Sequence, residues 1–305
     1  MTVLKVFLSV TLPLPRQRLS GCSCRSPLAH FYIHHAGSSL RELHPFTTVT
    51  HLASMNNATH SSEDDFPIQF LFRKQGGKGQ APSDAAVVPL PLRQRILRGK
   101  KQREQSTQWT ARLAALVDEQ QPELSKRQSD SNIDMERSPA TFAPGAVGIN
   151  VALRLEGPYF SPADPSRYDT VVCLVAGTGV VGAIAIAAAF NYAATNDFND
   201  STCKGLPPRK WRRCIIIWSV KETEDIELPF IEPKAEGLEL RKHLTGPGRS
   251  RVNLGQALSE ICVREKREGG CSWVYISGPN KYIDSGREAC QEVEQHTELD
   301  FYATS

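Results

Sequence analysis

The string AGTGVVG holds three glycines between a β-branched apolar run and an alanine-rich one. A strand, a glycine turn and a helix in this order let backbone amides approach a diphosphate at the helix N-terminus. The acidic residue that follows such turns in NAD sites has no clean counterpart, because Asp197 and Asp200 fall in a polar stretch. A tight turn without a ligand is the alternative. The string predicts a dinucleotide phosphate site at Gly177, Thr178, Gly179 and Gly182.

Two further apolar runs end in residues that could bind a ligand. The run CIIIWSVK places Ser219 and Lys221 at its end, and SWVYISGP ends in a turn made of Ser277, Gly278 and Pro279. The carboxyl ends of parallel strands share one sheet edge, where ligands of open α/β sheets bind. A hydroxyl and an ammonium suit a 2′-phosphate, which favours NADPH over NADH. The alternative for the lysine is simple solvation.

A third chemical string, HPFTT, lies in the first quarter of the chain. Pro45 fixes the backbone, Phe46 offers a flat apolar face and Thr47 offers a hydroxyl. This mixture can hold a planar heteroaromatic cofactor with one hydrogen bond to a ring nitrogen. An ordinary strand with a core phenylalanine is the alternative interpretation.

The elements that must position these residues follow from hydrophobic patterning in residues 148–305. Strand-like and helix-like runs alternate there: INVALRLEG, YDTVVCLVAG, VGAIAIAAAFNYAA, RCIIIWSV, NLGQALSEICVREKR, SWVYISG and NKYIDSGREACQEVEQ. Such alternation implies right-handed crossovers and a parallel doubly wound sheet. Residues 171–190 are long and apolar enough to cross a bilayer. Their β-branched start, glycines and alanine-rich end predict a strand, a turn and a helix instead, so we expect no transmembrane helix.

The remainder of the chain divides by composition. Residues 27–75 hold short β-rich runs, which predict part of a small and incomplete antiparallel β-barrel. Residues 76–147 are rich in Gly, Pro, Ser, Gln and basic residues, so we expect low-complexity insertions with one helix near 107–120. Residues 1–26 lack a clear assignment, and their basic, acid-poor start leaves a targeting signal open.

Composition excludes several classes of function. The chain has 305 residues, and its 36 basic against 33 acidic side chains give a formal charge of only +3, so nothing indicates a nucleic-acid partner. The 8 cysteines form no CxxC pair and no cluster at metal-ligand spacing. We therefore expect reduced thiols, no structural metal and no disulfide framework.

The order of the motifs carries a resemblance that no single motif would support. HPFTT, the strand FLFR, the string QWTARL, LRLEGPYF, the glycine turn and SGPNKYI follow one another. In this order the chain resembles the ferric reductase and NADPH oxidase branch of the ferredoxin-reductase-like superfamily. It looks like the cytosolic, FAD- and NAD(P)-binding half of a fungal-type ferric reductase, over residues 27–302.

The resemblance implies a role for each motif. It implies FAD contacts from His44, Pro45, Phe46, Thr47, Arg73, Trp109 and Thr110. It implies a turn joining two lobes at Gly157, Pro158 and Tyr159, with Phe160 where the family has glycine. Ser277 stands where the family has cysteine, and it would lie near the nicotinamide. Thr47 and Ser277 are therefore the expected catalytic residues.

The function expected from the resemblance is an NAD(P)H-dependent FAD oxidoreductase of ferric-chelate reductase type. The nicotinamide would give a hydride to the flavin, which would pass single electrons to an acceptor such as ferric iron. The family is membrane-associated with this half in the cytosol, so a haem-bearing membrane domain would be supplied elsewhere. The alternative is a truncated, inactive nucleotide-binding remnant. A cytochrome b5 reductase type is a further alternative, but its usual Arg-x-Tyr-Ser string is missing from the sequence.

Overall fold

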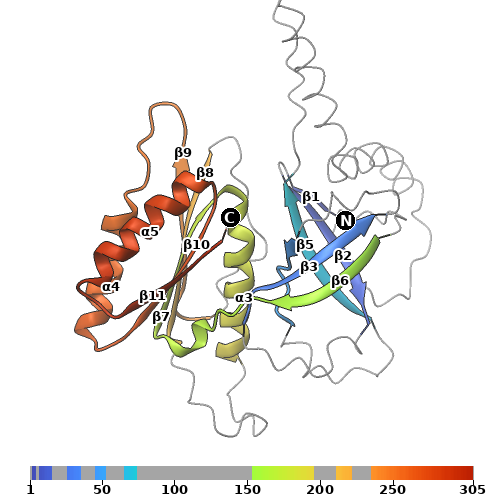
Figure 1. Ribbon diagram of the computed structural model, residues 1–305, viewed down its shortest axis with the longest axis horizontal. Helices are drawn as coiled ribbons and strands as arrows, with labels where there is room; N and C mark the ends of the chain where they lie inside the picture. Colours follow the sequence, from blue (N-terminus) through green and yellow to red (C-terminus); the bar gives the residue numbers. More distant parts are fainter. Residues whose placement is uncertain are drawn as a thin grey trace, which may run out of the picture. The chain divides into compact units, whose positions relative to one another are not determined.

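A computed structural model describes the parts of the chain shown in colour in Figure 1, which are residues 2–4, 7–15, 26–35, 45–52, 65–73, 153–195, 211–221 and 235–304. Within these ranges the strands form two three-stranded sheets and one five-stranded sheet. The predicted helix near 107–120 and the insertions around it lie outside the described residues.

The five-stranded sheet is parallel throughout. Its strands are β7 (Thr170–Ala176), β8 (Arg213–Lys221), β9 (Leu238–Thr245), β10 (Ser272–Ser277) and β11 (Leu299–Thr304). They lie in the order β11-β10-β7-β8-β9. The chain thus winds first to one side of β7 and then to the other. In such sheets the crevice at the carboxyl ends of the two strands beside the reversal, here β7 and β10, is the ligand position.

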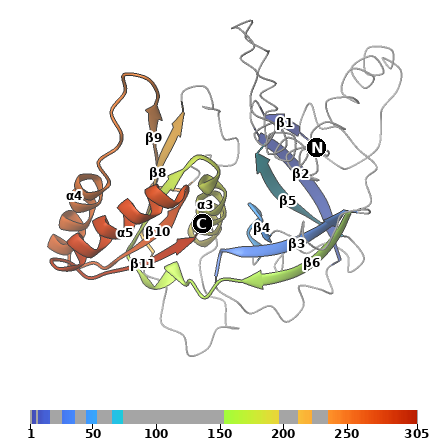
Figure 2. The same cartoon turned by 45° about the horizontal axis from the view of Figure 1, so that its top comes forward.

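Helices cover both faces of this sheet (Figure 2). On one face lie α4 (Leu254–Arg267) and α5 (Asn280–Glu294), whose apolar residues Leu258 and Ile283 join a buried cluster with Ile217 of β8 and Ile276 of β10. The other face holds α3 (Val180–Thr195). The stretch Gly177–Ala194 is long and apolar enough to cross a membrane, but 61% of it is buried inside the protein. Such burial is typical of a core helix.

The N-terminal strands form a small antiparallel barrel-like unit. The first sheet has the order β1-β2-β5, from β1 (Thr2–Leu4), β2 (Phe7–Leu14) and β5 (Phe66–Arg73). The second has the order β4-β3-β6, from β4 (Pro45–Thr47), β3 (Ala29–His35) and β6 (Leu153–Phe160). An antiparallel bridge from Thr48 to Phe70 connects the two sheets. Phe70 and Phe31 fill the space between them, edge to face at 5.7 Å.

The predicted fold class is confirmed: antiparallel strands precede a parallel sheet with helices on both faces. Every run expected in residues 148–305 forms a strand or a helix of the expected kind. Strands β9 and β11, at the two edges of the sheet, were not predicted. Residues 2–4 and 7–14, whose role the sequence left open, form β1 and β2, and β2 pairs with β5.

Candidate functional site

Two turns interlock at the carboxyl ends of β7 and β10. A Cβ added to Gly179, in the turn after β7, would lie 2.4 Å from the Ser277 carbonyl oxygen at the end of β10. A Cβ added to Gly278 would lie 2.9 Å from the Cβ of Ala176, at the end of β7. Each turn therefore contains a glycine that admits the other strand's end. The tertiary structure brings together the two motifs that the sequence placed on one edge.

The three glycines after β7 have different functions. Gly177 has a φ of +55°, which favours glycine, and nothing lies within 4 Å of its Cβ position. Gly182 lies against β10, because a Cβ there would be 2.1 Å from the Tyr275 hydroxyl. Gly179 and Gly182 thus permit packing inside the protein. Gly177 alone leaves an open face that a ligand can approach, with the exposed Thr178 beside it.

Trp218 holds the glycine turn in place, and the sequence did not single it out. Its indole Nε1 donates a hydrogen bond of 3.1 Å to the carbonyl oxygen of Gly177. The ring is fully buried in β8, and Lys242 Nζ of β9 lies 5.7 Å from its centroid. A buried tryptophan needs a partner for its N–H, and that requirement was the signal available in the run CIIIWSVK.

The end of β8 lies beside the same turn. Ser219 is in register with Ala176 of β7 and is only 8% exposed. Its hydroxyl has no hydrogen-bond partner among the described residues. Lys221 is the exposed last residue of β8, in register with Thr245 of β9. The structure therefore places Ser219 at the turn and Lys221 further along the same edge.

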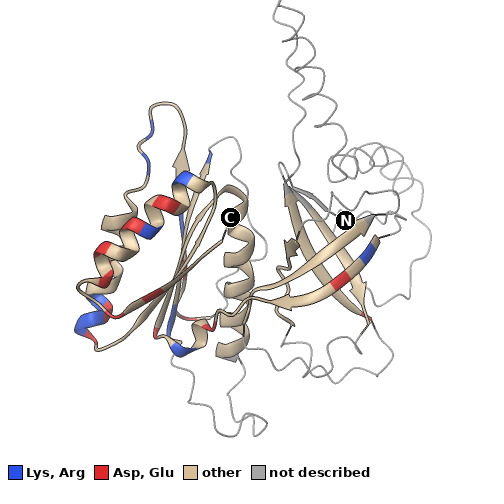
Figure 3. Ribbon diagram, in the orientation of Figure 1, with Lys and Arg blue, Asp and Glu red and all other residues tan. Residues whose placement is uncertain are grey.

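Basic residues of the unpredicted strand β9 and of the loop after it extend this edge. Figure 3 marks positions of Lys and Arg in blue at the end of β8 and on the loop between β9 and α4. This loop contains Arg249 and Arg251, and its carbonyl oxygen at Ser250 lies 2.9 Å from His243 Nε2 of β9. The string RKHLTGPGRSR was the sequence signal for this basic segment, which can attract an anionic ligand.

The helices that begin at this edge differ in their caps. The Asn253 side chain caps α4 by accepting a hydrogen bond of 3.0 Å from the Gln256 N–H. At α5 the capping residue is Pro279, which makes no side-chain cap. Ala176 likewise makes no side-chain cap for the short 3₁₀ turn Gly177–Gly179 that leads into α3. Uncapped N–H groups carry partial positive charge, so these two turns favour an anion.

The HPFTT string lies in the barrel, where its threonines have separate roles. Thr48 is fully buried and donates from its hydroxyl to the Gln69 carbonyl at 3.0 Å, closing the string onto β5. Thr47 and Phe46 are half-buried in β4, and Pro45 is exposed. Among the described residues no hydrogen bond forms to the Thr47 hydroxyl. His44, Trp109 and Thr110 lie outside the described residues, as does the side chain of Arg73, the last residue of β5.

Gly157, Pro158 and Tyr159 lie inside strand β6, not in a turn after it, which corrects the sequence prediction. Gly157 has a φ of +131°, and a Cβ there would be 3.1 Å from the His30 carbonyl of β3. The close approach of β3 explains the glycine. Tyr159 is 41% exposed and stacks on the His30 ring at 5.7 Å. Burial lowers the pKa of His30, which favours the neutral form of the imidazole.

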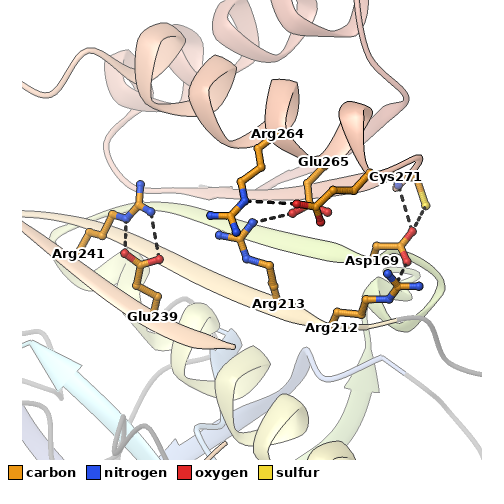
Figure 4. Close-up of polar contacts among 9 residues, drawn as sticks. Asp169, Arg212, Arg213, Glu239, Arg241, Arg264, Glu265 and Cys271 are labelled. Atoms are coloured by element: carbon orange, nitrogen blue, oxygen red, sulfur yellow. Dashed lines mark hydrogen bonds and ion pairs between the residues drawn. The ribbon is translucent and has the colours of Figure 1, made fainter. Parts of the chain in front are cut away.

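The amino edge of the parallel sheet has the opposite character (Figure 4). The buried Asp169 carboxylate accepts a hydrogen bond of 3.1 Å from the Cys271 N–H and lies 3.6 Å from Arg212 Nε. Glu265 of α4, 4% exposed, pairs with Arg213 at 2.6 Å. These contacts connect the starts of β7, β8 and β10 with the end of α4. The charged groups pair with other residues of the protein.

No protein-family model and no curated protein matches this sequence. Solved structures do match. The ferredoxin reductase of carbazole 1,9a-dioxygenase in its FAD apo form has 14% identity and a TM-score of 0.45, over 99% of this chain but only 64% of that one. The ferredoxin-NADP+ reductase from Plasmodium falciparum with 2′P-AMP has 7% identity and a TM-score of 0.46, over 100% and 94%. The siderophore-interacting protein SipS from Aeromonas hydrophila has 14% identity and a TM-score of 0.47, over 99% and 85%.

Proposed function

We propose that this protein is an NAD(P)H-dependent flavin oxidoreductase of ferric-chelate reductase type. One observation carries the proposal: the glycine turn and the Ser277–Pro279 turn interlock where the parallel sheet reverses its winding, the position at which such sheets bind nucleotides. The antiparallel unit that carries HPFTT supports the flavin half of the proposal.

The carboxyl edge fits a dinucleotide in shape and charge. Gly177 leaves its Cβ side open, and the uncapped turns before α3 and α5 present N–H groups to an anion. Lys221 and the loop with Arg249 and Arg251 add positive charge further along the edge. The diphosphate would lie at the glycine turn, and a 2′-phosphate would reach the basic segment. This distribution favours NADPH over NADH.

The barrel fits a planar aromatic cofactor at the HPFTT string. Phe46 offers part of its ring, and the Thr47 hydroxyl makes no hydrogen bond to a described residue, so it can donate to a flavin ring atom. The neighbouring Thr48 holds the string to β5 and fixes its position. FAD bound here would supply a centre that accepts a hydride, passes on its two electrons one at a time and releases the proton.

The protein's own residues need only bind and orient. Ser277, 7% exposed at the end of β10, would set the position of the nicotinamide through the turn that follows it. No side chain is required as a general acid or base for the hydride transfer, and the proton left on the flavin after the two electrons have passed on would go to solvent water. We also propose that ferric iron in a chelate is the acceptor, and that a haem-bearing membrane domain is a partner.

The test begins with the full 305-residue chain purified in the presence of FAD. We expect flavin absorbance after removal of free FAD, its bleaching by NADPH under anaerobic conditions, and its return on addition of ferric citrate. A protein that binds NADPH but retains no flavin would be the inactive nucleotide-binding remnant. A protein that retains flavin but is not reduced by either nicotinamide nucleotide would refute the oxidoreductase assignment. Flavin that is bleached by NADPH but not reoxidised by ferric citrate would overturn only the acceptor.

A further inference from the structure

The hydroxyls of Ser219 and Tyr282 are a pair that the glycine-turn argument does not use. Ser219 lies near the end of β8, and Tyr282 lies in the first turn of α5. Tyr282 packs against the buried cluster that includes Ile217, and Ser219, two residues after Ile217, faces the same side of the sheet. The two side chains therefore meet on the α5 face.

The position of the pair relative to β7 follows from the strand order. β8 lies on one side of β7, with Ser219 beside Ala176, and β10, from which α5 continues, lies on the other side. The contact from Ser219 to Tyr282 thus passes over the carboxyl end of β7. This end carries the open Gly177 turn, on which the proposed diphosphate would rest.

Neither hydroxyl is satisfied within the described chain. Ser219 is more than nine-tenths buried, and its Oγ and the Tyr282 oxygen both lack a hydrogen-bond partner of acceptable geometry among the described residues. They are close enough to interact, since the Ser219 hydroxyl lowers the Tyr282 pKa against the larger effect of burial, which raises it to about 12. A buried hydroxyl without a partner costs free energy. Two such hydroxyls close to each other, beside the uncapped start of α5, can donate to one ligand oxygen.

We propose that Ser219 and Tyr282 together bind one oxygen of the nucleotide's diphosphate, which makes Tyr282 a binding residue for the dinucleotide. The inference rests on the nucleotide site proposed above and adds to it a specific pair of donors. At neutral pH the phenol is a neutral O–H donor, as an anionic phosphate oxygen requires. The pair would therefore bind the diphosphate. Lys221 would bind a 2′-phosphate without Ser219, which replaces the shared role that the sequence predicted for the two residues.

The test measures the affinity of the FAD-loaded full chain for NADPH, ADP and 2′-AMP by calorimetry, for Ser219→Ala, Tyr282→Phe and the double variant. We expect each single variant to weaken NADPH and ADP about tenfold, as loss of a hydrogen bond to a charged group does. The double variant should be weaker than either single variant, by up to about a hundredfold, because it removes both donors. The affinity for 2′-AMP, which has no 5′-diphosphate, should change less than about twofold by the same reasoning.

Thr170→Val is the matched control, because the Thr170 hydroxyl is also buried and without a described partner but lies at the amino edge of the sheet. It should leave all three affinities unchanged. This inference is overturned if Ser219→Ala and Tyr282→Phe bind NADPH and ADP as tightly as Thr170→Val does. That result would not contradict the proposed nucleotide site. Equal losses for 2′-AMP and NADPH would overturn it as well. If the wild-type chain binds none of the three ligands, the proposed function itself fails.

Discussion

The two edges of the parallel sheet are built on opposite rules. At the amino edge the buried carboxylates of Asp169 and Glu265 each have a cation and short polar contacts (Figure 4). At the carboxyl edge Ser219 and Tyr282 have unsatisfied hydroxyls, and two of the three helix starts have no side-chain cap. At the first edge the protein's own residues pair with the buried carboxylates. The second edge has polar groups without partners in the described part of the chain, which a ligand can bind.

This difference separates stability from binding within one sheet. Buried charges that lose a partner cost several kcal/mol, so changes at the amino edge should act on folding. Unsatisfied groups contribute nothing to the folded chain that a substitution could remove. Changes to the ligand-facing groups of the carboxyl edge should therefore act on affinity. Two described groups at the amino edge are exceptions, because the Thr170 hydroxyl and the Trp211 Nε1–H also lack a hydrogen-bond partner within the described residues.

The largest effect is expected from Asp169→Ala. It removes the acceptor of the Cys271 N–H and the partner of Arg212, so the free energy of unfolding should fall by about 2–3 kcal/mol in urea denaturation. NADPH affinity of the folded protein should not change. Glu239→Ala is the control, because its pair with Arg241 is exposed and is worth less than about 1 kcal/mol. Weaker NADPH binding without a loss of stability would break the division between the edges.

The next effect separates two glycines of one turn. Gly179→Ala should destabilise the fold by about 2 kcal/mol, because the new Cβ would overlap the Ser277 carbonyl. Gly177→Ala should cost only about 1 kcal/mol, from its left-handed backbone, and should reduce NADPH affinity in a chain that still folds. Thermal denaturation and NADPH titration of both variants test this. If Gly177→Ala binds NADPH as tightly as the wild type, the diphosphate does not bind at the open face of the turn.

A smaller effect is expected at the far end of β8. Lys221→Ala should weaken NADPH by about 1–2 kcal/mol through loss of a charge-assisted contact to the 2′-phosphate. NADH should be almost unaffected, since it has no such phosphate. Titration of both nucleotides against the FAD-loaded protein measures the difference. Equal losses for the two nucleotides would show that the basic segment does not read the phosphate.

The smallest effect extends the comparison to the barrel. Thr48→Val should lower the free energy of unfolding by about 1 kcal/mol, because the Thr48 hydroxyl bonds to Gln69 and accepts from the Thr50 N–H. Thr47→Ala should leave stability unchanged but alter flavin binding or reduction by about 0.5–1.5 kcal/mol, the value of one hydrogen bond. Flavin spectra and anaerobic reduction rates separate the two. If Thr47→Ala changes neither the flavin spectrum nor its reduction rate, the flavin ring does not contact this hydroxyl.

The inner strands and the helices that cover the sheet could be predicted from the sequence, because their buried apolar residues follow a regular pattern. Strand β7 is fully apolar over most of its length, and α4 and α5 alternate apolar and charged residues at helical spacing. The edge strands β9 and β11 escaped prediction. Each pairs on one side only, so LELRKHLT and LDFYAT keep charged residues that an inner strand would exclude.

The sequence predicted only those parts of the candidate site that follow from the parallel order of the strands. Alternating strands and helices placed Gly177, Ser219 and Ser277 at strand ends, and the carboxyl ends of parallel strands must meet at one edge. Trp218 and Tyr282 were missed, because their significance depends on groups from distant parts of the chain. Trp218 donates to the Gly177 carbonyl, and Tyr282 lies near the Ser219 hydroxyl.

The glycines of the turn after β7 show which features the local sequence predicts and which depend on tertiary packing. The residue types alone placed a turn at 177–182, since glycines between a β-branched run and an alanine-rich run break both elements. Which glycine serves the fold and which one is open to a ligand depended on Ser277 and Tyr275, whose strand reaches the turn only after the sheet has formed. Local conformational preference acts between neighbours in sequence, whereas steric exclusion acts between neighbours in space, and only the folded chain specifies the second kind.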